Sequence, residues 1–378
     1  MNSALLADLE TPTVLVDRDR LLANIARVQT IADRRGLRLR PHLKTHKCFQ
    51  IAALQLERGA VGFTASKVDE AVALIDCGAT SLTLAYPIAD GRKLRRLLSA
   101  AREREVEIRT IADSAEGIEI LAAIAAEFGN RLDVFLKIDV GLHRCGFAED
   151  DPRLLAAAQS IAAASSLRFA GLLSHAGHAY GAKGRTEIAA IAAEECAILQ
   201  RVRAILEAAA FEVAEVSVGS TPTVLASESY EGVTEIRPGN YVFFDATAIR
   251  LGIATLDEIA LTVLATIVSR NDKYFIIDAG SKVLSSDVGA HGTGSGLGYG
   301  LAFTLDGGED PNAALHIARL SEEHGFVERG DADLAIGTKV RIVPNHSCPV
   351  ANLTDQLAIV SRGAVLERWP VAARSRVR

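Results

Sequence analysis

Eight short strand-like runs alternate with helical segments over residues 37–237, and this alternation limits the fold more than any other feature of the chain. The runs lie at residues 37–43, 60–65, 81–86, 106–111, 132–139, 168–175, 213–219 and 233–237. The segments between them are rich in Ala, Leu, Glu and Arg and end near Gly or Asn, as helices usually do; they lie at 67–77, 90–104, 114–128, 151–165 and 185–210. This pattern predicts an α/β fold with a closed, eight-stranded parallel (TIM-type) barrel. A doubly wound open sheet is the alternative, but no Gly-x-Gly-x-x-Gly loop follows the first strand.

The pattern changes near residue 240, where strand-like runs separated by turn residues replace the helices. These runs lie at 241–244, 259–268, 274–278 and 339–344. A chain of 378 residues also exceeds what one hydrophobic core usually supports. We therefore expect a barrel domain at residues 11–240, in which a helix at 18–35 precedes the first barrel strand. Residues 1–10 and 241–378 are expected to form a second, β-rich domain.

The composition argues against several partners. A net charge of -6 is unfavourable for binding nucleic acid. The chain also contains no run of about 18 apolar residues, the length that a membrane-spanning helix needs. The 5 cysteines lack the paired spacing of a disulfide framework. No export signal is visible at the start of the chain, so we expect a cytoplasmic protein.

Residues 40–47, Arg-Pro-His-Leu-Lys-Thr-His-Lys, contain the first candidate for catalysis. Lys44 falls where the first predicted strand opens into a loop. A lysine that is partly desolvated at such a point has a lowered pKa, and its free amine can form a Schiff base with an aldehyde cofactor. A solvated basic loop is the alternative interpretation.

Two glycine-containing loops follow the last two predicted barrel strands, where such barrels often bind phosphate. The first contains Gly219, Ser220 and Thr221, and the second contains Gly239, Asn240 and Tyr241. Either loop alone could be a tight turn. Together with Lys44, they fit pyridoxal phosphate, held by an imine at one end and by its phosphate at the other.

Other strand ends supply polar groups to the same barrel mouth. Arg144 follows the fifth strand, and His175, His178 and Tyr180 follow the sixth. Arg144 could reach the phenolic oxygen of the cofactor, and Tyr180 could face its ring nitrogen. Alternatively, Arg144 could pair with a carboxylate, and His175 could be a core histidine with its hydrogen bonds satisfied.

The segment Pro344-Asn345-His346-Ser347-Cys348 contains a candidate metal site. On an extended segment, His346 and Cys348 point to the same side and can bind one borderline metal ion such as zinc. Two protein ligands leave positions open for water and substrate. The alternative is a buried thiol next to a loop histidine.

With these motifs, the chain resembles the fold-type III pyridoxal-phosphate enzymes, in the branch of the metal-activated D-serine dehydratases, D-threo-3-hydroxyaspartate dehydratases and D-threonine aldolases. The most specific motifs lie at residues 40–47, 217–223, 239–245 and 344–348. The resemblance implies an alanine-racemase-like barrel, a β-rich second domain and a homodimer. By position, Lys44 would carry the cofactor and Arg144 would contact it, while His346 and Cys348 would bind the metal. The residues expected to surround the cofactor are His175, Tyr180, Gly219, Ser220, Thr221, Gly239, Asn240 and Tyr241.

The resemblance leads us to expect a pyridoxal-phosphate- and divalent-metal-dependent dehydratase that converts a small D-3-hydroxyamino acid, such as D-serine or D-threo-3-hydroxyaspartate, to a 2-oxo acid and ammonia. The His-x-Cys pair resembles the dehydratases, whereas residues 139–146 and 350–353 resemble the aldolases. Zinc is the favoured ion, with manganese and magnesium as alternatives. The other hypotheses are a D-threonine aldolase-type lyase that releases glycine and an aldehyde, and a non-catalytic pyridoxal-phosphate carrier.

Overall fold

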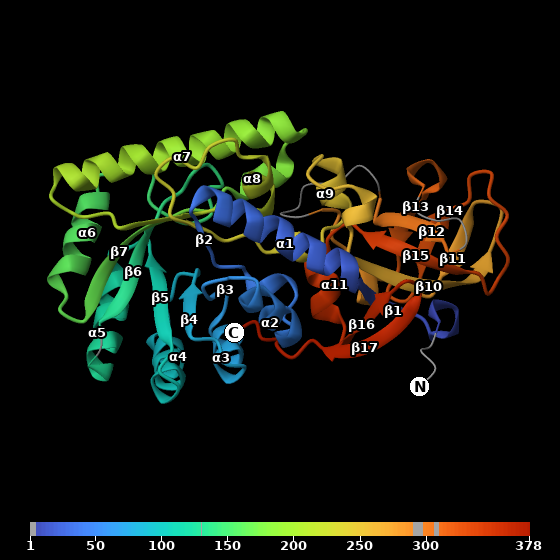
Figure 1. Cartoon of the computed structure of the whole chain (residues 1–378), viewed down its shortest axis with the longest axis horizontal. Coiled ribbons are helices and arrows are strands. Elements are labelled where there is room, and N and C mark those ends of the chain that lie inside the picture. The colour runs from blue at the N-terminus through green and yellow to red at the C-terminus, as the bar shows by residue number, and fades with distance from the viewer. Residues whose placement is uncertain (1–4, 130, 290–297, 306–309) are drawn as a thin grey trace. The chain divides into compact units, whose positions relative to one another are not determined.

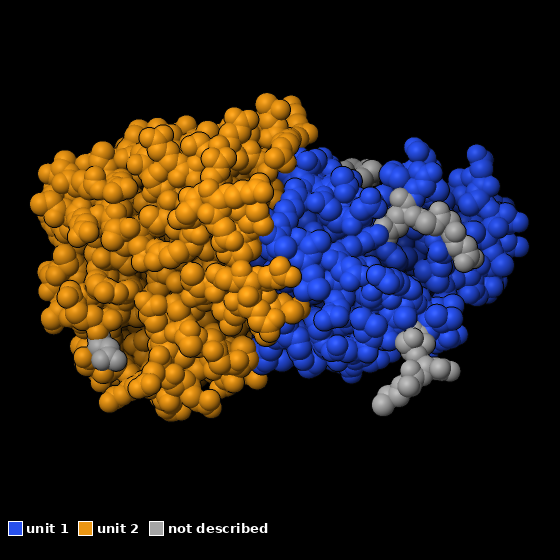
Figure 2. All heavy atoms as spheres, viewed as in Figure 1, with its two compact units in different colours: residues 1–27, 45–51, 240–374 blue, residues 28–44, 52–239, 375–378 orange. Residues whose placement is uncertain are grey.

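The computed structural model describes residues 5–129, 131–289, 298–305 and 310–378, and the chain divides into two compact units. Unit 1 comprises residues 1–27, 45–51 and 240–374, and unit 2 comprises residues 28–44, 52–239 and 375–378 (Figure 2). Residues 11–27 and 45–51, which we expected in the barrel domain, thus group with the β-rich unit. Residues 11–27 group with unit 1 because strand β1 (Thr13–Asp17) pairs with two strands of the unit 1 sheet.

Unit 2 is built on an eight-stranded parallel sheet, as the sequence predicts. Its strands pair in the order β2-β9-β8-β7-β6-β5-β4-β3. Beyond the two edge strands, His42 and Thr64 form a parallel bridge, and the N–H of Val61 donates to the carbonyl of Leu39 at 2.9 Å, so the sheet curls round and its edges meet. The strands are β2 (Arg38–Leu39), β3 (Phe63–Ala65), β4 (Ser81–Leu84), β5 (Glu107–Ala112), β6 (Leu132–Lys137), β7 (Leu167–Leu173), β8 (Glu215–Val218) and β9 (Glu235–Ile236).

Helices pack against these strands and against one another, α3 on α4, α4 on α5 and α5 on α6 (Figure 1). Their bounds are α3 (Val68–Asp76), α4 (Gly91–Glu103), α5 (Ala115–Phe128), α6 (Leu154–Ala163) and α7 (Arg185–Ala208), each within a few residues of the prediction, as is α1 (Arg18–Arg35). The sequence analysis missed α2 (Phe49–Glu57) and α8 (Thr221–Ala226). In α8, Ser220 caps the first turn and Pro222 lies within it, where a missing N–H costs nothing, so a turn-like sequence forms a helix.

Unit 1 is built on a nine-stranded sheet in the order β11-β14-β13-β12-β15-β10-β1-β16-β17. Besides β1, its strands are β10 (Leu261–Arg270), β11 (Tyr274–Ile277), β12 (Gly300–Thr304), β13 (Leu315–Leu320), β14 (Gly325–Glu328), β15 (Lys339–Pro344), β16 (Gln356–Ser361) and β17 (Ala364–Pro370). The short helices of this unit include α9 (Ala246–Arg250), α10 (Ser281–Leu284) and α11 (Ser347–Leu353). None of the helices in the described part of the chain has the length and apolar content needed to cross a bilayer.

The predicted strand at residues 241–244 is wrong. The segment begins with the 3-10 helix η4 (Asn240–Val242), and the N–H groups of Phe243 and Phe244 both donate to the carbonyl of Asn240, at 3.0 and 2.9 Å. Phe244 has a φ of 52°, which no strand adopts. The aromatic side chains of residues 241–244 are buried. The segment nevertheless forms a turn, because local hydrogen bonds replace pairing with a neighbouring strand.

A buried carboxylate, Glu235, links several strands inside the unit 2 barrel. It accepts hydrogen bonds from Arg40 Nε at 2.8 Å, from Arg109 Nη1 at 3.1 Å and from Ser217 Oγ at 2.6 Å. Burial alone would raise the pKa of Glu235, but the two arginines and then the hydroxyl outweigh it and lower the pKa to about 2. The four side chains, from β5, β8, β9 and the end of β2, thus form one charged network in a region without solvent.

We predict that Glu235→Ala lowers the free energy of unfolding by about 3–5 kcal/mol, because it removes the carboxylate partner of the buried Arg40 guanidinium and leaves Arg109 paired with Glu215 alone. Urea unfolding followed by circular dichroism measures this change. Glu127→Ala is the matched control, since Glu127 pairs with Arg95 on the barrel surface and should leave stability nearly unchanged. Equal effects from the two substitutions would contradict the importance of the buried network.

Candidate active site

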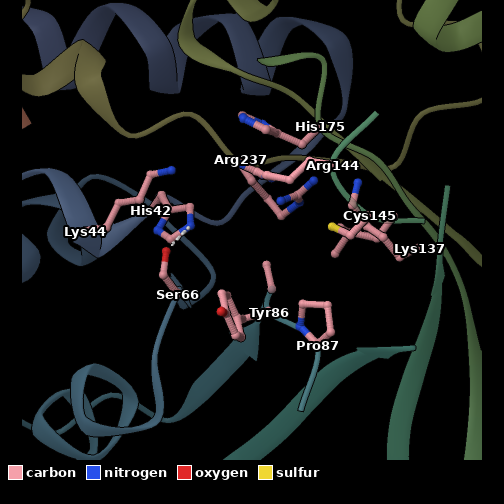
Figure 3. Close-up of a pocket in the computed structure, with 12 residues that line it drawn as sticks. His42, Lys44, Ser66, Tyr86, Pro87, Lys137, Arg144, Cys145, His175 and Arg237 are labelled. Carbon is pink, nitrogen blue, oxygen red and sulfur yellow. Dashed lines mark hydrogen bonds between the residues drawn. The ribbon is translucent and has the colours of Figure 1, made fainter. Parts of the chain in front are cut away.

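Unit 2 contains a cavity of about 400 Å³ that brings together three of the predicted site residues, Lys44, Arg144 and His175. Figure 3 shows their side chains pointing toward a common space from different strand ends. The described residues that line it are His42, Lys44, Ser66, Ala85, Tyr86, Pro87, Lys137, Arg144, Cys145, Leu173, His175 and Arg237. This lining includes four Lys or Arg side chains and no carboxylate. The cavity is therefore suited to an anionic ligand.

Lys44 reaches the cavity from a single turn that follows a very short strand. Strand β2 ends at Leu39, and Lys44 is the middle residue of the 3-10 helix η2 (Leu43–Thr45). Its side chain is half-buried. Beside it, His42 Nε2 and Ser66 Oγ lie 3.3 Å apart (Figure 3). The turn thus places the Lys44 side chain in the cavity lining.

His175 connects the cavity with the first predicted phosphate loop. Its Nδ1 lies 3.1 Å from the carbonyl oxygen of Gly219, so Nδ1 carries the hydrogen and donates it. Burial, and then the positive charge of Lys44, lower the pKa of His175 well below its usual value. The imidazole is therefore neutral at physiological pH.

The phosphate loop has the conformation that such a role requires. Gly219 has a φ of 115°, and a Cβ atom there would lie 3.0 Å from a methyl group of Val224. Ser220 Oγ accepts from the N–H of Thr223 at 3.4 Å and so caps α8. Thr221 Oγ1 is buried, and no described residue forms a hydrogen bond with it. A buried hydroxyl without a protein partner, at the start of a helix, fits a bound phosphate.

The other predicted cofactor residues do not line this cavity. Tyr180 lies in the 3-10 helix η3 (Gly177–Gly181), which packs against α8. Gly239 is the last residue of its unit 2 segment, whereas Asn240 and Tyr241 belong to unit 1 and are buried there. Their assignment as cofactor residues stays a prediction.

Lys137 and Arg237 line the cavity but were not among the predicted site residues. Lys137 ends β6, and its Nζ donates to the carbonyl of Ile138 at 3.2 Å. Burial, followed by the charge of Arg237, lowers the pKa of Lys137 to about 8. Lys137 ends a barrel strand and Arg237 directly follows one. That position in the sequence could have identified both as candidate site residues.

The candidate metal pair lies in unit 1, at the start of α11. We expected an extended segment, but β15 ends at Pro344, and only His346, the residue before the helix, is extended, whereas Cys348 lies in the first helical turn. The two side chains still interact with each other. Burial opposes charge on both groups, but their mutual attraction raises the pKa of His346 to about 10 and lowers the pKa of the Cys348 thiol.

The surroundings of His346 fit a metal ligand. Its Nδ1 lies 2.9 Å from Asp287 Oδ2, which leaves Nε2 as the atom that can bind an ion. Metal-binding histidines usually donate their other N–H to a carboxylate in this way. Within the residues that the structure describes, no group of three or more His, Cys, Asp or Glu side chains could hold an ion. His346 and Cys348 thus stay the predicted ligand pair.

Two family models match successive parts of the chain. Residues 16–247 match the family model described as alanine racemase, N-terminal domain, and residues 260–360 match the one described as putative serine dehydratase domain. A D-threo-3-hydroxyaspartate dehydratase from Delftia sp. (strain HT23) is 37% identical over 375 residues, which cover 96% of this chain and 97% of that protein. A D-threonine aldolase from Arthrobacter sp. is 29% identical and covers 98% of this chain and 94% of that protein.

Solved structures support the same relationship. The structure of the Delftia dehydratase superimposes with a TM-score of 0.90 at 34% identity, covering 97% of this chain and 98% of that chain. A cysteine-to-alanine mutant of the same dehydratase, described as being in the metal-free form, gives the same TM-score. An alanine racemase from Clostridium difficile shares the fold alone, with a TM-score of 0.69 at 12% identity over 96% of this chain and 100% of that chain.

Proposed function

We propose a function for this chain on the premise that it belongs to the family that joins an alanine racemase N-terminal domain to a putative serine dehydratase domain. The relatives in this family are dehydratases and aldolases, and the chain is a pyridoxal-phosphate-dependent lyase. Its proposed reaction is the dehydration of D-3-hydroxyamino acids such as D-threo-3-hydroxyaspartate or D-serine. The products are a 2-oxo acid and ammonia.

The unit 2 cavity is the proposed site for the cofactor. Lys44 would hold it covalently, Arg144 and His175 would contact it, and the loop at Gly219–Thr221 would bind its phosphate. We keep Tyr180, Gly239, Asn240 and Tyr241 as further proposed cofactor residues. When bound, pyridoxal phosphate withdraws electrons from the α-carbon of the amino acid joined to it. The cationic lining and the buried Thr221 hydroxyl support this assignment.

Lys44 is the proposed base. Its free amine would remove the α-proton of the substrate. A neutral His175 next to it adds no positive charge that would oppose protonation of the lysine. The α C–H bond and the β C–O bond break, water leaves, and hydrolysis of the unsaturated amine returns one water and releases ammonia.

His346 and Cys348 are the proposed ligands of the divalent ion. A bound ion polarises the β-hydroxyl and so stabilises the hydroxide that departs. A thiolate ligand favours zinc over harder ions such as manganese or magnesium. Asp287 would keep the His346 ring in the required orientation. We also propose that the enzyme is a cytoplasmic homodimer.

The observation that favours dehydration over aldol cleavage is the pairing of His346 with Cys348 at the start of α11. Elimination needs help for a leaving hydroxide, which a strong Lewis acid such as zinc supplies. Aldol cleavage needs only removal of the proton from the same oxygen. The match to a D-threonine aldolase makes that cleavage the second candidate.

The cofactor assignment predicts which lysine becomes labelled. Reduction with borohydride after addition of pyridoxal phosphate should attach the cofactor to Lys44, as peptide mass spectrometry would reveal. Lys44→Ala should abolish the label, whereas Lys282→Ala, on an exposed lysine of unit 1, should not. Attachment to Lys137, which has a lowered pKa in the same cavity, would contradict the role of Lys44.

The proposed reaction predicts distinct products from D-threonine. Dehydration yields 2-oxobutanoate and ammonia, whereas aldol cleavage yields glycine and acetaldehyde. We expect mainly 2-oxo acid from D-threonine, D-serine and D-threo-3-hydroxyaspartate when zinc is present, as measured by coupled dehydrogenase assays and amino-acid analysis. The L-enantiomers serve as controls and should react slowly. Stoichiometric glycine from D-threonine would replace the dehydratase assignment with that of an aldolase.

A further inference from the structure

We propose that Asn240 and Asp245 are positioning residues for the metal pair, an inference that rests on the proposed metal site. Neither residue is a ligand candidate, since each has its side chain engaged with the turn that carries the ligands. Both are buried in unit 1, with exposed fractions of 6% for Asn240 and 1% for Asp245. Their contacts point to a network that orients the thiolate.

The carboxylate of Asp245 organises the start of α11. Its Oδ2 accepts a hydrogen bond from the N–H of Ser347 at 3.0 Å, between the two ligand candidates in sequence. Its Oδ1 accepts from the N–H of Ala248 at 3.2 Å and so caps α9. One buried carboxylate therefore joins the first turns of two helices. This arrangement fixes the main chain between His346 and Cys348.

The side-chain amide of Asn240 connects this carboxylate with the sulfur atom. Its Nδ2 donates to Asp245 Oδ2 at 2.8 Å, and it lies 2.9 Å from Ser347 Oγ and 3.8 Å from Cys348 Sγ. The two amide hydrogens have their nearest acceptors in Asp245 and Ser347, and the same nitrogen contacts the sulfur at the longer distance. The side chain of Asn240 is thus fixed by two hydrogen bonds where it packs against Cys348, and it limits the rotation of the sulfur.

The sulfur atom also contacts the hydroxyl group of Thr45. Cys348 Sγ lies 3.3 Å from Thr45 Oγ1, which accepts from the thiol. The sulfur thus lies between the amide of Asn240 and the hydroxyl of Thr45, and these two contacts limit the positions that it can take. Groups that hydrogen-bond metal ligands typically alter metal affinity by about 10- to 100-fold when they are removed.

Titration of the purified protein with cobalt(II) provides the test, because a cobalt–thiolate bond gives a charge-transfer absorption that reports directly on the sulfur. Wild-type protein should show this band, and Cys348→Ala should lose it. Asn240→Ala should weaken cobalt binding by about 10- to 100-fold and should shift the band at saturating cobalt. Asp245→Asn, which preserves the side-chain shape, should change the cobalt affinity and the band position in the same direction. This second variant provides the test if Asn240→Ala fails to fold.

Thr247→Val is the matched control. Thr247 is buried in the first turn of α9, which Asp245 caps, and its Oγ1 donates to the carbonyl of Asn345 at 2.7 Å, but no hydrogen bond joins it to the sulfur within the described part of the chain. We expect this variant to keep the band position and the affinity of the wild type.

The outcomes separate the inference from the proposed function. If the wild type shows no thiolate band, the metal site itself is wrong. If the wild type binds cobalt through Cys348 and both network variants leave affinity and band unchanged, the positioning role is wrong while the metal site stands. An equal loss of affinity in Thr247→Val, without any band shift in Asn240→Ala, would also overturn the inference, because general loosening would explain it.

Discussion

The buried ion pair between Glu235 and Arg40 joins the two strands whose ends carry much of the candidate cofactor site. Arg40 directly follows β2, and the chain then runs through His42 to Lys44. Glu235 begins β9, and Arg237, which lines the same cavity, directly follows that strand. The carboxylate has 0% exposure and accepts from both Arg40 and Arg109, so β2 and β9 are held together by charge as well as by main-chain pairing. The position of the catalytic lysine candidate thus depends on a buried charge network whose residues are not among those that line the cavity.

The two units supply chemically different sites. Unit 2 offers a cavity rich in Lys and Arg, with a neutral imidazole at His175, and it suits an anionic cofactor. Unit 1 offers a thiol with a lowered pKa and an imidazole at the start of one helix, with the imidazole held by Asp287, and this pair suits a borderline metal ion. Neither site alone explains a dehydration. The proposed function requires acid–base chemistry from the first and Lewis-acid chemistry from the second.

Much of this arrangement follows from sequence periodicity, and the remainder depends on tertiary contacts. The eight barrel strands and the long helices were predictable because apolar residues recur with the spacing of each element, and Lys44, Arg144 and His175 were found because they follow strands. The turn at residues 241–244 was not predictable, since an aromatic, β-branched run normally forms a strand and only the hydrogen bonds to the Asn240 carbonyl redirect it. The membership of β1 in the unit 1 sheet depends on pairing with β10 and β16, which lie far away in sequence. The direction of the Asn240 amide likewise depends on Asp245 and Ser347.

The central claim is that cofactor and metal are both needed but are bound by separate sets of residues. Treatment of the active enzyme with a chelator, followed by dialysis, tests it most directly when cofactor absorbance and turnover of D-threo-3-hydroxyaspartate are measured on the same sample. Our account predicts that turnover is lost while the cofactor absorbance stays nearly intact, and that added zinc restores the activity. Chelation that removes the cofactor, or that leaves the turnover rate unchanged, would contradict the account.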